Sequence, residues 1–366
     1  MATSGVLERG GNCFGFLRFV LAGLVIFSHS FSIGGFSGEP LDGTNARTLG
    51  FVAVFGFFAL SGALVGRSAE DATTGRFLWH RVRRIFPAYW VCLLVTAVAI
   101  APLIAIIRGL PLGSVSPSGT PGPYTYFTGN FLLEIRQYGI GNVLKGLPYP
   151  EALNGSIWTL TFEFTCYLVV FVIVRVWISA GRRNAVLLLV LATSLVLTVF
   201  AWRGQIAPAI VLPLLGTLDG PLLYALWSTF LVSACMALWR DWVPFTPRIV
   251  TVCGIGFVIS IPLDLFLPYG VLLLPYVILG LGCYLPSFLR PVGTKNDLSY
   301  GLYLYGFPAG QILISFSLTL WGAITLTLAT IILATTFAAV SWFLVERWFL
   351  RGPGARDPRP SLASAK

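Results

Sequence analysis

The chain has 366 residues, of which 56% are hydrophobic and only 10% are charged, whereas soluble domains carry about 25% charged residues. This composition excludes an ordinary soluble domain and indicates a multi-span membrane protein. The formal net charge of +10 does not indicate nucleic acid as a partner. Most Lys and Arg residues fall in short loops between apolar segments, as expected of cytoplasmic loops. We therefore expect a lipid bilayer as the surroundings and no nucleic acid.

Ten apolar stretches predict membrane-spanning helices. They are residues 14–33, 49–66, 86–107, 156–177, 185–202, 222–239, 249–267, 270–288, 298–318 and 321–344. Alternate loops carry most of the Lys and Arg, so the positive-inside rule places those loops and both termini in the cytoplasm. The sequence thus predicts an all-α, polytopic membrane helical bundle over residues 1–351 and a disordered cytoplasmic tail over residues 352–366.

The first predicted span carries two ionisable residues, Arg18 near its start and His29 near its end. Such residues are costly in a membrane and normally face the bundle interior or a wet cavity. Eleven residues separate them, which returns to nearly the same helix face roughly 16 Å further along the axis. We interpret this helix as the spine of an active site. A histidine that merely bonds to a helix backbone fits the position of His29 equally well.

A basic loop follows the second span and ends in Arg81-Val-Arg83-Arg84 just before the third. Arginine forks suit phosphate oxygens, so Arg81 and Arg84 are candidates for a phosphate clamp. An ordinary positive-inside anchor is the competing interpretation. The next loop, residues 108–155, is rich in Gly, Pro and Tyr, and loops of that length tend to be functional lids or disordered segments.

The fourth span opens with a polar face formed by Thr159, Glu163 and Tyr167, which are four residues apart. Counted from the membrane surfaces, Glu163 lies roughly 10 Å deep, at a depth similar to that of His29. This match predicts a base, His29, with a carboxylate that orients it. In the alternative, Glu163 only bonds a tyrosine or pairs with a cation elsewhere.

Two further spans carry weaker signals. Ser61 and Gly62 lie in the second, where small residues suit close helix contact. The ninth holds Tyr300 and Tyr303, and tyrosines are common at membrane edges for structural reasons alone. It also holds Gln311, which that preference does not explain. With only two histidines in the chain, we expect no metal site.

Taken in order, five motifs resemble the acyltransferase-3 family of membrane-bound acyltransferases. They are Arg18-x(10)-His29, Phe57-Phe58-x-x-Ser61-Gly62, Arg81-x-x-Arg84, Trp158-x-Leu-x-x-Glu163-x-x-x-Tyr167 and Ser299-Tyr300-x-x-Tyr303-Leu-x-Gly306-x-Pro308. Each motif alone is weak, but five in this order are specific. Phe55 stands where the family often has an acidic residue, and Gly306 replaces a family histidine.

The resemblance implies transfer of an acyl group, commonly acetyl from acetyl-CoA, to a hydroxyl of a carbohydrate in the bacterial inner membrane. It implies acyl-CoA and a carbohydrate acceptor as partners, no permanently bound cofactor, and no soluble SGNH-type domain in this chain. The implied catalytic residues are His29 and Glu163. His29 acts either as general base on the sugar hydroxyl or as a transient carrier of the acyl group, and the sequence does not decide between these roles. The implied acyl-CoA-binding residues are Arg18, Arg81 and Arg84. Candidates for substrate or oxyanion contacts are Ser61, Trp158, Tyr167, Tyr300, Tyr303 and Gln311.

Two other classes of protein fit the same pattern. Ten spans with buried polar groups suit a transporter or flippase for a lipid-linked sugar, although the chain has no obvious inverted repeat. The replacement at Gly306 also leaves open a non-catalytic subunit of a glycan assembly complex.

Overall fold

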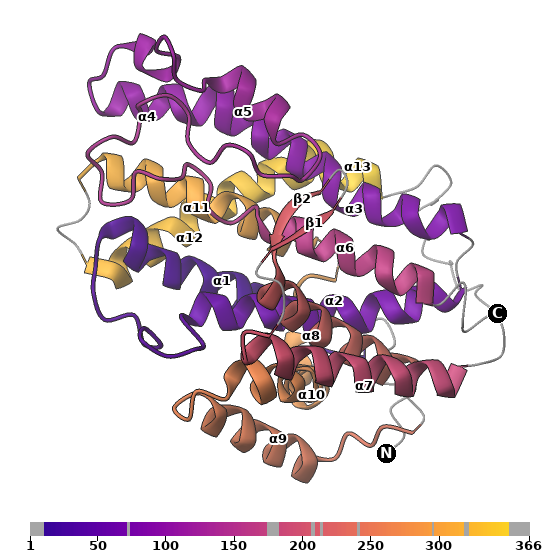
Figure 1. Ribbon diagram of the computed structural model, residues 1–366. Coiled ribbons are helices and arrows are strands. Elements are labelled where there is room, and N and C mark those ends of the chain that lie inside the picture. Colours follow the sequence, from indigo (N-terminus) through magenta and orange to yellow (C-terminus); the bar gives the residue numbers. More distant parts are fainter. Residues whose placement is uncertain are drawn as a thin grey trace, which may run out of the picture.

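A computed structural model describes residues 11–71, 74–173, 183–205, 209–212, 215–239, 242–294, 296–317 and 322–350. These residues form one bundle of helices that lie side by side, with a single short β-hairpin among them (Figure 1). The tail predicted over residues 352–366 lies outside the described residues.

Each predicted span coincides with helix. The corresponding helices are α1 (Phe14–Gly34), α2 (Leu49–Asp71), α3 (Thr74–Val95), α6 (Thr159–Val172), α7 (Arg183–Trp202), α8 (Gly220–Leu238), α9 (Pro247–Ser260), α10 (Val271–Tyr284), α11 (Ser299–Ser315) and α12 (Gly322–Ser341). Helix α3 continues through a π-helical turn, Thr96–Ile100, into α4 (Ala101–Ile107). Helix α12 continues in the same way through Trp342–Glu346 into α13 (Arg347–Leu350).

Six helical stretches in the described part of the chain are long and apolar enough to cross a membrane. They are Phe14–Gly34, Leu49–Ser68, Gly75–Ile107, Gly220–Leu238, Phe266–Tyr284 and Gly322–Leu350. Three others, which include most of α6, α7 and α9, are apolar but shorter. The prediction of a helical, multi-pass membrane protein is confirmed, whereas the count of ten spans and the location of the termini stay predictions.

Helix α2 lies at the centre of the bundle and touches α1, α8, α10 and α6. Glycines bring its backbone close to two neighbours. A Cβ atom added at Gly62 would lie 2.2 Å from the carbonyl oxygen of Phe230 on α8, and one at Gly50 would lie 2.8 Å from Cβ of Ser28 on α1. The close helix contact expected at Gly62 is thus confirmed.

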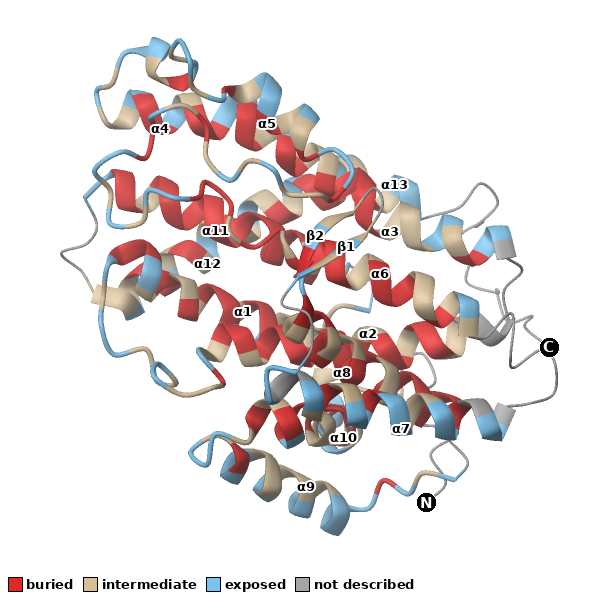
Figure 2. Ribbon diagram, viewed as in Figure 1, coloured by how far each residue is buried: buried red, intermediate tan, exposed pale blue. Residues whose placement is uncertain are grey.

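Helix α11 is buried along nearly its whole length (Figure 2) and packs against both α12 and α1. Gly301 packs on Ala338 of α12, and Gly306 packs on Ile26 of α1. Tyr303 is only 8% exposed. It therefore belongs to the interior and not to an aromatic belt at the membrane edge.

The long segment between α4 and α6 is folded, with a 3₁₀ turn at Leu112–Val115 and helix α5 (Pro123–Gly129). The buried side chain of Asn130 accepts hydrogen bonds from the backbone N–H groups of Arg136 and Gln137, at 2.9 and 3.1 Å. This segment is therefore an ordered cap and not a disordered loop. The connection between α7 and α8 contains a hairpin in which β1 (Ala209–Leu212) pairs with β2 (Gly216–Asp219).

Candidate active site

His29 lies near the end of α1 and lines a cavity of about 110 Å³. The cavity is lined by Val25, His29, Thr48, Gly50, Phe51, Val54, Ser156, Trp158 and Tyr303. Phe307 meets the imidazole edge to face, with ring centroids 4.9 Å apart. Nδ1 of His29 is buried and has no hydrogen-bond partner within the described chain. The imidazole is therefore not held by a helix backbone at this nitrogen.

The irregular segment before α6 lies within the bundle and reaches this cavity. Asn154 is fully buried, and its amide donates to the carbonyl oxygen of Leu304 on α11 at 3.0 Å. Tyr303, one residue earlier on α11, donates from its hydroxyl to the carbonyl oxygen of Ser156 at 2.8 Å. Two consecutive residues of α11 therefore hold residues 154–158 beside His29.

Glu163 does not contact His29. Its Oε1 accepts hydrogen bonds from the hydroxyls of Ser61, at 2.8 Å, and Tyr167, at 2.5 Å. The predicted pairing of Glu163 with the imidazole is therefore absent, and the competing interpretation, a carboxylate bonded to a tyrosine, matches the structure.

The depth estimate for Glu163 is wrong for a physical reason. It assumed that residue 156 lies at the membrane surface, but Ser156 is 1% exposed and already lies within the bundle. Trp158, which lines the cavity, is therefore at the level of His29. Glu163 follows five residues later, which is about 7.5 Å further along the helix.

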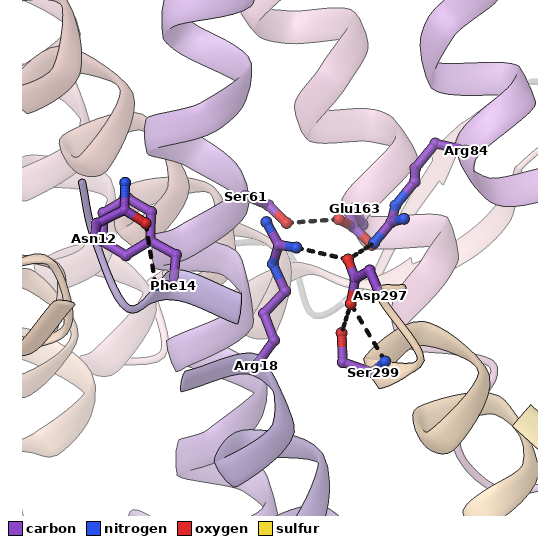
Figure 3. Close-up of polar contacts among 8 residues, drawn as sticks. All are labelled: Asn12, Phe14, Arg18, Ser61, Arg84, Glu163, Asp297 and Ser299. Atoms are coloured by element: carbon purple, nitrogen blue, oxygen red, sulfur yellow. Dashed lines mark hydrogen bonds and ion pairs between the residues drawn. The ribbon is translucent and has the colours of Figure 1, made fainter. Parts of the chain in front are cut away.

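A second polar cluster surrounds Asp297, at the other end of α1 (Figure 3). One carboxylate oxygen, Oδ2, accepts from Arg18 at 2.7 Å and from Arg84 at 2.9 Å. Ser299 donates to the other oxygen at 2.5 Å. Burial raises the pKa of Asp297, but the charges of Arg84 and Arg18 outweigh that effect and hold this pKa well below its usual range. Each guanidinium keeps further N–H groups for another anion.

Arg81 borders the same cluster through aromatic contacts. Its guanidinium lies over the rings of Phe77 and Tyr167, 5.6 Å from each centroid. Its Nε atom is buried without a hydrogen-bond partner in the described residues. Figure 3 shows Arg18 and Arg84 beside Ser61 and Glu163. Arg81 joins this group through Tyr167, which donates to Glu163.

Two further candidate substrate contacts, Tyr300 and Gln311, also have partners within the protein. The hydroxyl of Tyr300 donates to the carbonyl oxygen of Ile85 at 3.0 Å. The amide of Gln311 donates to the carbonyl oxygens of Tyr149 and Ala152, at 2.9 and 2.8 Å. These side chains hold the third helix and the cap onto α11. By contrast, Trp158 and Tyr303 do line the cavity of His29.

Sequence reasoning singled out neither Asp297 nor Ser156 as a site residue. The signal for Asp297 was its place directly before a span that carries three tyrosines. Ser156 gave no comparable signal, because a serine in front of a predicted span usually lies at the surface. In the described residues, no group of three or more His, Cys, Asp and Glu side chains is placed to hold a metal ion.

The fold and the two clusters define a multi-pass membrane protein with a buried histidine site at one level and a buried arginine–aspartate site at the other. Residues 12–345 match the acyltransferase domain of the Acyl_transf_3 family. The chain belongs to this family, and both the predicted resemblance and the predicted enzyme class, an acyltransferase, are confirmed.

Two relatives cover nearly the whole chain. One is the O-acetyl transferase of Shigella phage Sf6, which is 27% identical over 352 residues and is matched over 93% of this chain and 96% of its own length. The other is Nodulation protein 10 of Rhizobium leguminosarum bv. viciae, which is 29% identical over 364 residues, with 92% of each chain covered. No solved structure matches the chain.

Proposed function

We propose that the protein moves an acetyl group from acetyl-CoA to a hydroxyl of a carbohydrate, and that it works in the bacterial inner membrane. One observation carries the proposal. Helix α1 carries Arg18, which shares Asp297 with Arg84, and His29, whose Nδ1 has no hydrogen-bond partner in the described residues; the two positions are roughly 16 Å apart along one helix face. The name of the phage relative, an O-acetyl transferase, supports acetyl as the transferred group and oxygen as the acceptor atom.

The donor binds by its phosphates at the arginine cluster. Guanidinium groups bind phosphate in a bidentate manner, and Arg18 and Arg84 already converge on one anionic oxygen. In CoA, the extended pantetheine arm separates the phosphates from the thioester, and this arm follows α1 from Arg18 to His29. The positive-inside rule supports a cytoplasmic location for the arginines, which is the side where acyl-CoA is available.

The acceptor sugar enters the cavity of His29. The imidazole removes the proton from the acceptor hydroxyl while the oxygen attacks the thioester carbonyl. The C–S bond then breaks, the acetyl ester forms, and the leaving thiolate of CoA takes up the proton. Trp158 and Tyr303 line this cavity and are the proposed contacts for the sugar.

The test uses the full-length protein in lipid nanodiscs, with acetyl-CoA labelled in the acetyl group and polysaccharide isolated from the bacterial surface as the acceptor. The wild-type protein is expected to transfer label into base-labile ester, and His29→Ala to abolish transfer. His80→Ala is the matched control, because His80, the other histidine, is exposed; it keeps wild-type transfer. Normal transfer by His29→Ala, or movement of a sugar without acetylation, would overturn the proposal.

A further inference from the structure

The backbone of Ser156 is held on both sides. Its N–H group donates to the side-chain oxygen of Asn154 at 3.1 Å. Its carbonyl oxygen accepts from the hydroxyls of Tyr303, at 2.8 Å, and Thr159, at 3.3 Å. Asn154 is in turn anchored to the carbonyl oxygen of Leu304 at 3.0 Å. Residue 156 therefore has little freedom to move relative to α11.

The hydroxyl of Ser156 is the one polar group of this residue without a partner. Its Oγ is buried and makes no hydrogen bond within the described chain, although Ser156 lines the same cavity as His29. Buried hydroxyls are normally hydrogen-bonded, because an unpaired one loses its bonds to water and gains nothing in return. Ser30, a buried serine on α1, follows that rule and donates to the carbonyl oxygen of Ile26 at 2.8 Å.

We propose that the Ser156 hydroxyl is a catalytic hydrogen-bond donor to the carbonyl oxygen of the acyl group. This inference rests on the proposed function and adds a residue to it. When the acceptor oxygen attacks, the carbonyl oxygen becomes an oxyanion, and Ser156 donates to it while His29 holds the proton of the acceptor. A donor that is already fixed in place stabilises such charge without reorganisation. The apolar walls of the cavity, Val25 and Val54, strengthen this interaction by excluding water.

The test compares Ser156→Ala with the wild-type protein in the transfer assay described above. Loss of one oxyanion donor is expected to lower kcat about 10²- to 10³-fold, with little change in either KM, because the contact forms only in the transition state. The thermal unfolding midpoint is expected to stay unchanged, since the hydroxyl makes no bond in the free protein. Ser156→Thr restores the donor and recovers activity.

Ser315→Ala is the matched control. Ser315 is buried on α11, donates to the carbonyl oxygen of Gln311 at 2.7 Å, and does not line the cavity; its removal is expected to leave kcat unchanged.

Three results would overturn the role of Ser156. They are wild-type kcat in Ser156→Ala, a higher acceptor KM at unchanged kcat, and an acetyl ester on Ser156 in acid-quenched wild-type protein. The last result would make the serine a nucleophile. If Ser156→Ala transfers acetyl normally while His29→Ala does not, only this inference fails. If wild-type protein transfers no acetyl, the proposed function fails instead.

Discussion

Replacing Asp297 by Asn is expected to destabilise the protein, because Oδ2 of this carboxylate is the shared acceptor for Arg18, at 2.7 Å, and Arg84, at 2.9 Å. Breaking a fully buried pair costs about 3–5 kcal/mol, whereas an exposed pair contributes about 0–1 kcal/mol. The side chains here are 12% to 26% exposed. We therefore expect an intermediate loss of about 1–3 kcal/mol, or roughly 2–6 °C in the unfolding midpoint.

The assay is thermal unfolding of the full-length protein in nanodiscs. Glu134→Gln is the matched control, since Glu134 accepts from Arg136 at 2.5 Å in a more exposed pair, with the arginine 66% exposed; its loss should leave the midpoint nearly unchanged. CoA should raise the midpoint of Asp297→Asn more than that of the wild type, because its phosphates replace the missing charge. Equal midpoints for Asp297→Asn and Glu134→Gln would refute the reasoning.

The pH dependence of this stability difference follows from the pKa of Asp297. Burial raises this pKa, but the charges of Arg84 and Arg18 hold it below its usual range. A depressed folded-state pKa contributes stability that is present above the unfolded pKa, about 3.9, and is lost as the pH falls through the folded value. The difference in unfolding midpoint between the wild type and Asp297→Asn should therefore stay constant from about pH 8 to pH 5. A gap that closes within this range would contradict the assignment of the charge.

Two further substitutions test the packing and the corrected position of Glu163. Gly306→Ala is expected to lower stability and transfer, because the added Cβ would lie 2.7 Å from Cγ1 of Ile26, one turn before His29. Gly254→Ala, where nothing lies within 4 Å of the added Cβ, should instead stabilise α9 by up to about 1 kcal/mol. A change of the same sign in the unfolding midpoint of both variants would refute this account. Glu163→Gln should leave the pH profile of transfer unchanged, since Glu163 does not touch the imidazole; a shifted profile would restore their predicted pairing.

Hydropathy and charge located the helices well, because apolar length is a strong constraint in a membrane. The joint placement of Arg18 and His29 on α1 followed from helical periodicity alone. The position of Glu163 could not be predicted in the same way. Counting depth requires knowing where a helix begins, and residues 150–158 enter the bundle before α6 starts at Thr159. The hydrogen bonds between α11 and residues 152, 154 and 156 reveal that entry.

Ser156 illustrates a different limit of sequence reasoning. Its significance lies in a bond that is not made, and an unpartnered atom becomes visible only after every neighbour has been placed. The role of Asp297 was also hidden in the sequence, because its two arginine partners are 279 and 213 residues away in the chain.

Helix α11 links the two clusters mechanically. Asp297, two residues before its first turn, holds the arginines, and Leu304 and Tyr303 in its middle hold the segment that carries Ser156. If the arginines bind the donor as proposed, a sliding or rotation of α11 would change both the donor site and the position of Ser156. Under the proposed function, a displacement of α11 caused by binding at the arginines would therefore also move the segment beside His29.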